Sequence, residues 1–309
     1  MVAVLMSTYN GQEYIKKQID SVLNQTFSDF LLYIRDDGST DNTISLIEEY
    51  DDERIRLICG KNLGPAESFF DLLRQTENCE HIFFCDQDDE WNPDKIEKML
   101  EIIKKYDEPT MVFSDFTMID ENSNVINESY EKNCGLQIEN SEKILPKILA
   151  QPYVFGCASV INRKLADMVK YPPDGIEMHD CWISLVAASV GNLIYMPTQT
   201  IKHRFHSSNA TGRAGSDSFT TRLKRITVGL RDMSENSYLR LSQVDLLLNS
   251  HITELKLQQK NLLKDISAAK KRGKLPLLKA LVKNGVSRQR FLNTLFFYFS
   301  ILIYKGELK

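Results

Sequence analysis

An acidic run, Asp86, Asp88 and Asp89, directly follows the apolar segment 81–85. Carboxylates this close together repel one another unless a cation balances their charge. Hard divalent cations such as Mg²⁺ and Mn²⁺ take oxygen ligands and commonly join a carboxylate to substrate phosphates. Asp86 and Asp88 are two residues apart, so on an extended segment their side chains face the same side. The run predicts a divalent cation site, and a solvated acidic turn before a helix near 93 is the alternative.

Two further polar turns follow β-rich segments, Ser-Thr-Tyr-Asn-Gly at 7–11 and Arg-Asp-Asp-Gly-Ser-Thr-Asp at 35–41. Ligands of open α/β folds bind in the crevice at the carboxyl ends of the strands. If the segments before these turns are neighbouring parallel strands, the turns line one crevice together with the acidic run. Taken alone, the turn at 35–41 is better explained by Asp and Ser side chains that cap a helix.

The elements that must position these turns alternate along the first 120 residues. β-rich runs predict strands at 2–8, 30–36, 54–59, 81–86 and 110–114, and amphipathic stretches predict helices at 12–25, 41–51, 65–76 and 93–106. This order is typical of an α/β fold with βαβ units on a mostly parallel sheet flanked by helices. The less regular part predicts a mixed sheet, with strands near 115–127, 154–161 and 192–197 and helices near 163–169 and 178–190.

Charge divides the chain into two regions. Residues 1–218 contain 20 Lys and Arg against 36 Asp and Glu, a net charge of −16, whereas residues 219–309 contain 18 against 6, a net charge of +12. The total of −4 argues against a dedicated nucleic-acid binder. Segment 207–218 has almost no apolar residues and reads as a linker. We therefore expect an acidic α/β domain at 1–215 and a basic helical region at 216–309.

The basic region ends in the apolar, aromatic segment 291–304. This segment is too short to span a bilayer and suits a helix that lies in a membrane interface. Together with the positive charge of 219–309, it predicts docking on an anionic membrane surface. The alternative is that 219–309 packs on itself or forms the seam of a homo-oligomer.

The six cysteines form no C-x-x-C pair and stand mostly in apolar runs, which favours reduced thiols in the cytosol. We expect no secretory signal, because residues 1–11 lack a basic start and a cleavage site. The expected location is cytoplasmic, peripheral at the inner face of the cell membrane.

The ordered set of motifs resembles that of the inverting family 2 glycosyltransferases of the GT-A fold. The motifs are Ser-Thr-Tyr-Asn-Gly after the first strand, Asp-Asp-Gly-Ser-Thr-Asp after the second, and Asp-x-Asp after the strand at 81–86. The resemblance covers about residues 1–210 and is greatest to bacterial rhamnosyltransferases of cell-surface polysaccharide synthesis. It implies a Rossmann-like GT-A domain and a divalent metal, Mg or Mn, as cofactor.

The resemblance also implies roles for single residues. Asp36 matches the carboxylate that binds the pyrimidine base, and Arg204 matches a group that approaches the diphosphate. Asp88 and Asp86 match the metal ligands, and His206 matches a third, although a lone His is more often packed or on the surface. The residues implied to contact the nucleotide sugar are Thr8, Tyr9, Asn10, Glu13, Asp36, Asp37, Asn62, Asp86 and Arg204.

An inverting transferase needs one base to take the proton from the acceptor hydroxyl, while the nucleoside diphosphate leaves from the opposite face. Within Met178–Trp182, the resemblance implies that Asp180 is this base; a helix N-cap is the alternative. The only tryptophans, Trp91 and Trp182, adjoin candidate catalytic carboxylates, and aromatic faces suit sugar rings. We expect both, with His179, to contact the acceptor; burial in the core is the alternative for the tryptophans.

The leading hypothesis is transfer of L-rhamnose from dTDP-L-rhamnose to a saccharide hydroxyl of a lipid-linked polysaccharide precursor. The alternatives are a UDP-hexose donor and a non-catalytic module that binds nucleotides or carbohydrates. A nucleotidyltransferase is disfavoured, because the Gly-rich basic phosphate loop that it needs after the first strand is absent.

Overall fold

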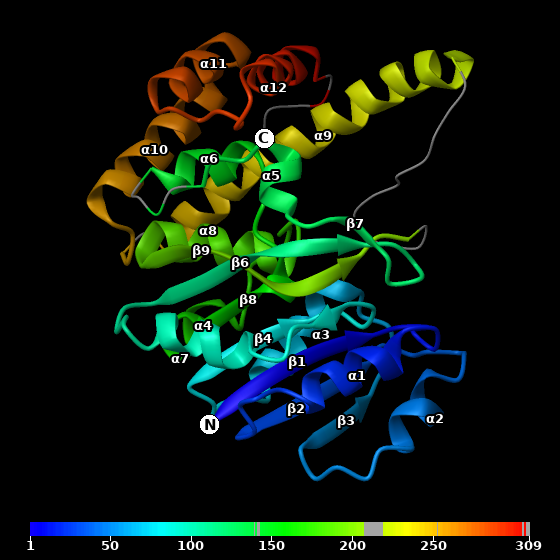
Figure 1. Cartoon of the computed structure of the whole chain (residues 1–309). Helices are drawn as coiled ribbons and strands as arrows, with labels where there is room; N and C mark the ends of the chain where they lie inside the picture. The colour runs from blue at the N-terminus through cyan, green and yellow to red at the C-terminus, as the bar shows by residue number, and fades with distance from the viewer. Residues whose placement is uncertain (139, 141–142, 207–218, 252, 305, 307–309) are drawn as a thin grey trace.

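The computed structural model describes residues 1–309 except 139, 141–142, 207–218, 252, 305 and 307–309 (Figure 1). Its central feature is a nine-stranded sheet in the order β3-β2-β1-β4-β8-β6-β9-β5, with β7 paired to β6. The strands are β1 Val2–Thr8, β2 Phe30–Asp36, β3 Ile55–Cys59, β4 His81–Cys85, β5 Glu90–Trp91, β6 Thr110–Ile119, β7 Val125–Asn127, β8 Ser159–Asn162 and β9 Asn192–Arg204.

The first four strands are parallel, as the βαβ pattern predicted. Each side chain along β1 alternates between two cores: Val2, Val4 and Met6 enter one, and Ala3 and Leu5 enter the other. A strand buried on both faces reads as a continuous apolar run, which is why this strand was visible in the sequence. The mixed direction expected after residue 115 is confirmed, because β8 is antiparallel to β4 and β6, whereas β9 is parallel to β6.

The structure extends the predicted strand at 192–197 to Arg204. The register of β9 against β6 shifts at Pro197 and Thr198, since Ser114 lies opposite Met196 and Asp115 opposite Gln199. Proline cannot donate a ladder hydrogen bond, so it marks a bulge and looks like a strand end in the sequence. This extension brings His203 and Arg204 next to the loop that follows β4.

The helices of the body cover both faces of the sheet. α1 (Ile15–Leu23), α2 (Thr43–Glu48) and α4 (Lys95–Ile103) contribute to the core that holds Val4, whereas α3 (Pro65–Arg74), α6 (Ile144–Ala150), α7 (Arg163–Val169) and α8 (His179–Val190) contribute to the core that holds Leu5. The short elements are α5 (Tyr130–Cys134) and the 3₁₀ turn Gly156–Ala158. Helices α1 to α4 lie where the sequence predicted them and are a few residues shorter, and α7 and α8 match their predicted ranges closely, whereas α5 and α6 were not predicted.

The C-terminal region is helical, as expected. Its elements are α9 (Phe219–His251), α10 (Leu257–Lys271), α11 (Lys274–Lys283) and α12 (Phe291–Ile303), gathered at the end of the molecule opposite β1 to β3 (Figure 1). Leu241 of α9, Leu263 of α10 and Phe297 of α12 belong to the same hydrophobic core as α6 and α8. The region therefore packs on the body. The predicted boundary near 215 and the linker 207–218 lie outside the described residues.

Among the described residues, no helix combines the length and the apolar character that a membrane crossing needs. All six cysteines are free thiols; Cys79, Cys85 and Cys157 are buried.

Candidate active site

The three polar turns predicted from the sequence all begin at the carboxyl ends of neighbouring parallel strands, at one end of the sheet. β1 lies between β2 and β4, with Thr8 opposite Asp36 and Met6 opposite Cys85. The turns that follow these strands are therefore neighbours, and the predicted convergence is confirmed. Their side chains are the groups from which a ligand site at this edge can be built.

Hydrogen bonds between the turns fix their arrangement. The hydroxyl of Thr8 and the backbone N–H of Tyr9 both donate to the side-chain oxygen of Gln87, at 2.6 and 2.9 Å. The backbone N–H of Asn10 donates to the Ser39 hydroxyl at 2.8 Å. The Tyr9 side chain is 47% exposed, so its ring is open to a ligand from solvent.

Asp36 and Asp37 shape the second turn. The buried carboxylate of Asp36 accepts hydrogen bonds from the backbone of Gly38 and Ser39, at 3.0 and 2.8 Å, and from the Ser39 hydroxyl at 2.5 Å. A carboxylate has about four lone-pair sites, so Asp36 keeps acceptor capacity beyond these three bonds. Asp37 pairs with Arg35 and accepts from the backbone of Gly64 at 2.9 Å. Asp37 thus fixes the segment around Asn62 rather than facing solvent.

The other two residues implied to contact the nucleotide lie at the rim. Asn62 is exposed, and its side-chain oxygen accepts the backbone N–H of Gly64 at 3.1 Å. Glu13 is exposed beside Tyr14; burial and a hydrogen bond with Glu13 raise the pKa of Tyr14 to about 12. Both side chains are reachable from solvent.

The loop after β4 brings Asp88 against His206. The imidazole Nε2 of His206 lies 2.7 Å from a carboxylate oxygen of Asp88, although 118 residues separate them in the chain. Both side chains are partly exposed. Two of the three implied metal ligands are therefore neighbours at the surface of the site.

Asp86 shows the charge repulsion expected of a cation site. Burial and the negative charges of Asp89 and Asp88 raise the pKa of Asp86 to about 7, and Asp180 adds to this effect. A divalent cation would offset the repulsion and favour the ionised carboxylate. The donor set Asp86, Asp88 and His206, two carboxylates and an imidazole, fits Mg²⁺ or Mn²⁺.

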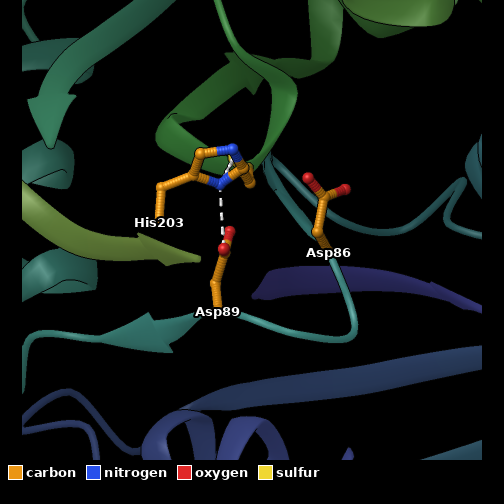
Figure 2. Close-up of side chains that lie close together, drawn as sticks. Asp86, Asp89 and His203 are labelled. Carbon is orange, nitrogen blue, oxygen red and sulfur yellow. Dashed lines mark hydrogen bonds and ion pairs between the residues drawn. The ribbon is translucent and has the colours of Figure 1, made fainter. Parts of the chain in front are cut away.

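A second group of possible ligands lies deeper, in Asp86, Asp89, Cys157 and His203, whose ligand atoms are all within 4.8 Å of one another. Figure 2 shows Asp86 and Asp89 rising from one loop and His203 reaching Asp89 from β9. The distance from Asp89 to Nδ1 of His203 is 2.8 Å. Burial raises the pKa of the Cys157 thiol well above its usual range, so Cys157 is a poor cation ligand.

The Asp89–His203 pair is an internal ion pair. Burial alone would lower the pKa of His203, but the charge of Asp89 and their hydrogen bond raise it to about 9. The reverse effect of His203 outweighs burial and lowers the pKa of Asp89. The pair joins the loop after β4 to the end of β9, and the sequence analysis missed it, although Asp89 stands in the acidic run and His203 directly precedes Arg204.

The structure corrects the predicted role of Arg204. Its fully buried guanidinium donates to the backbone oxygens of Asp88 and Asp120, at 2.8 and 2.9 Å, and to the Glu90 carboxylate at 2.8 Å. It also lies over the ring of Tyr14. A guanidinium committed to these acceptors holds the acidic loop in place and does not extend to a diphosphate.

Asp180 lies in the first turn of α8, partly exposed. One of its carboxylate oxygens accepts the backbone N–H of Gly156 at 3.0 Å. Next to it, His179 is buried against the ring of Phe69, with ring centroids 4.1 Å apart. Neither ring nitrogen of His179 has a hydrogen-bond partner among the described residues, and burial lowers its pKa. The imidazole is therefore neutral, and because both ring nitrogens are buried, His179 does not present the acceptor contact that the sequence predicted.

The structure also corrects the predicted acceptor contacts of the two tryptophans. Trp182 has no exposed surface and packs in the core of α8, near His251 of α9. Trp91 is 4% exposed, and the Lys95 ammonium covers its ring at 3.6 Å from the centroid. Neither indole presents a face to an acceptor, so the core-packing alternative is correct for both.

Comparison with known proteins identifies the family. The family model described as "Glycosyl transferase family 2" matches residues 3–169. The chain is 27% identical to the dTDP-rhamnosyl transferase RfbG of Shigella flexneri, over 72% of this chain and 78% of that protein. It is 25% identical to the UDP-Glc:alpha-D-GlcNAc-diphosphoundecaprenol beta-1,3-glucosyltransferase WfgD of Escherichia coli, over 83% of this chain and 94% of that protein.

Solved structures support the fold. TarS of S. aureus, residues 1–349 in complex with UDP, aligns with a TM-score of 0.58 at 17% identity, over 85% of this chain and 69% of that chain. The mannosyltransferase PcManGT of Pyrobaculum calidifontis, in complex with GDP-Man and Mn²⁺, aligns with a TM-score of 0.52 at 15% identity, over 98% of this chain and 86% of that chain. Both likenesses indicate a GT-A architecture.

Proposed function

The chain belongs to glycosyl transferase family 2 and is a glycosyltransferase, and from this premise we propose that it transfers L-rhamnose from dTDP-L-rhamnose with inversion. The acceptor is a saccharide hydroxyl of a lipid-linked precursor of a cell-surface polysaccharide. The name of the Shigella flexneri relative supports the donor, and that of the Escherichia coli relative supports a diphospholipid-linked acceptor.

The observation that carries the proposal is the convergence of the three turns at one sheet edge, joined by the bonds of Gln87 and Ser39. In this proposal the nucleotide lies against Tyr9, Asn10 and Asp36, because these groups offer an exposed ring and unspent hydrogen-bond capacity. Thr8, Glu13, Asp37 and Asn62 complete the donor site, either at its rim or by fixing its turns.

Asp86, Asp88 and His206 would hold a divalent cation, which balances the charge of the departing nucleoside diphosphate when it is bound. Asp180 takes the proton from the acceptor hydroxyl with Oδ1, which accepts the Cys181 N–H at 2.7 Å and keeps a second lone pair, while Oδ2 accepts the Gly156 N–H. The negative charge of Asp180 adds to the raised pKa of Asp86, which supports a position near the acidic loop. His179 is buried against Phe69, so in this proposal it packs behind the first turn of α8 and does not contact the acceptor.

A UDP-hexose donor is the second candidate, because the Escherichia coli relative named for UDP-Glc is covered over 94% of its length. A panel of dTDP-, UDP- and GDP-sugars, assayed for metal-dependent release of nucleoside diphosphate, tests both. Preferential turnover of dTDP-L-rhamnose supports the first donor, and preferential turnover of UDP-glucose replaces it. Binding of nucleotide sugars without any turnover would favour the non-catalytic binding module.

The proposal places the enzyme in the cytoplasm, peripheral at the inner face of the cell membrane. On α12, Phe291, Leu292 and Phe296 are 75%, 65% and 53% exposed, whereas Phe297 is buried against the rest of the region. On α11, Leu275 and Val282 are exposed beside Lys279 and Lys283. Apolar side chains flanked by lysines suit an anionic lipid surface. A homo-oligomer seam over the same face is the alternative.

A further inference from the structure

A groove of about 370 Å³ lies between the start of α3 and the segment that precedes α8. Residues 63–67 line one side, and residues 172–178 line the other. One wall continues into the donor turn, since the backbone N–H groups of Leu63 and Gly64 donate to Asp37, each at 2.9 Å. The other wall ends at Met178, two residues before Asp180. The groove is therefore lined by one segment that is bonded to the donor turn and by another that leads into α8 and the proposed base.

The chemistry of the groove walls selects the kind of molecule that fits. Glu67, Asp174 and Glu177 provide carboxylates, of which Glu67 pairs with Arg74 and Glu177 with Arg240, and no Lys or Arg stands among the lining residues 63–67 and 172–178. The lining residues thus offer no cation to a diphosphate, whereas the hydroxyls of a neutral sugar can donate to carboxylates. Pro65, Pro172 and Pro173 add rigid apolar faces. A pocket that combines apolar faces with a few polar groups is typical of a small-molecule site.

The C-terminal region holds one wall of the groove. Arg240 of α9 pairs with Glu177 and donates to the backbone oxygen of Ile148 at 3.3 Å. Three residues further along the same helix, Gln243 donates to the backbone oxygen of Gly175 at 3.1 Å. The wall is thus fixed from the side of α9, which preorganises the groove and reduces the entropy lost on binding.

We propose that this groove binds the uncharged saccharide unit of the acceptor and delivers its hydroxyl to Asp180. The inference rests on the proposed function and adds a location that neither the motifs nor the family match supplied. It also replaces the predicted contacts of Trp91 and Trp182, whose rings are buried.

Two variants test the groove: one fills it with a large side chain, and the other removes a carboxylate from its wall. The probe acceptor is α-D-GlcNAc diphosphate on an undecyl chain, with the donor that the nucleotide panel selects. Ala66→Trp is expected to lower transfer at subsaturating acceptor at least tenfold, because the indole occupies the groove. Asp174→Ala is expected to raise the acceptor KM about threefold to tenfold and leave the donor KM within twofold. Glu101→Trp and Glu101→Ala, on the exposed side of α4, are the matched controls.

Metal-dependent release of nucleoside diphosphate without acceptor is measured in every variant. This release is expected to stay within twofold of wild type in Ala66→Trp and Asp174→Ala, which shows that the fold and the donor site are intact. Transfer and acceptor KM at wild-type values in both variants would overturn the groove. Absence of release from the wild-type protein with every donor would instead overturn the proposed function.

Discussion

In the turns after β1, β2 and β4, polar side chains are held by neighbouring turns, whereas α12 presents Phe291, Leu292 and Phe296 to the outside without a cover among the described residues. The acidic loop, for example, is held by contacts with His203, Arg204 and His206. Side chains held in this way suit chemistry that depends on position. An apolar helix face suits attachment to a fluid surface, where area matters more than register.

The largest effect is expected from Asp180→Asn. The substitution keeps the shape of the side chain and its bond from the Gly156 N–H, but it removes the base. General base catalysis typically contributes about 10²- to 10⁴-fold, so we expect kcat to fall about 10³-fold with the donor KM unchanged. Steady-state kinetics with the selected donor and acceptor provide the measurement. Asp167→Asn, an exposed carboxylate on α7, is the control.

Near-normal turnover of Asp180→Asn would show that another group takes the proton. The role of Asp180 in the first turn of α8 would then be limited to the helix terminus and the Gly156 contact. The contrast between a chemical region and an attachment region would remain, but its base would have to be sought elsewhere.

The next effect is expected from Asp88→Ala, which removes a proposed metal ligand and the partner of His206. A bound divalent cation is worth several kcal/mol, so we expect a loss of about 100-fold or more in kcat/KM for the donor. Titration of activity with Mn²⁺ and Mg²⁺ is the measurement. Asp107→Ala, an exposed carboxylate beyond the end of α4, is the control. Full activity of the wild type in the presence of EDTA would contradict the metal assignment.

The sequence predicted most of the body, because β1 and β4 are buried on both faces and read as apolar runs, and polar turn residues follow β1, β2 and β4. It could not predict the burial of Trp182, since part of the cover of this ring is His251 of α9, which lies 69 residues further along the chain. It also could not predict that the Lys95 ammonium covers Trp91. Contacts of this kind depend on tertiary packing, which local residue patterns do not contain.

The same limit explains the site residues that changed role. Arg204 and His206, which the resemblance linked to the diphosphate and the metal, both contact Asp88 of the acidic loop. Strand alternation gives only the face on which each side chain lies, so it could not distinguish Arg204, which is buried under the loop, from His206, which reaches Asp88 at its surface. The bulge at Pro197 had also hidden the continuity of β9.

On the attachment side, we expect the triple variant Phe291→Ser, Leu292→Ser and Phe296→Ser to lose at least tenfold in binding to anionic liposomes. Each large apolar side chain contributes about 1.5–3 kcal/mol when fully buried, and insertion of three exposed ones is partial. Cosedimentation with phosphatidylglycerol vesicles is the measurement. Val125→Ser and Ile126→Ser on β7, also exposed, form the control.

Liposome binding unchanged by the triple variant would sink the membrane proposal. If the wild-type protein is instead a dimer in the absence of lipid and the variant is a monomer, the α12 face is an oligomer seam. Sedimentation equilibrium without vesicles measures this directly. The second result would keep α12 as an attachment surface and change only what it attaches to.

The smallest effect is expected where the two regions meet. Arg240 is 6% exposed at the side chain and joins α9 to Glu177 in the groove wall. Arg240→Lys keeps the positive charge but loses the fork that contacts both Glu177 and the Ile148 carbonyl, so the wall becomes less rigid. We expect the acceptor KM to rise about threefold and the donor KM and kcat to stay within twofold. Lys256→Arg, another basic residue of the C-terminal region that bonds the body at Gly191, is the control. Equal losses for donor and acceptor would mean that Arg240 serves stability alone and that the basic region does not take part in acceptor recognition.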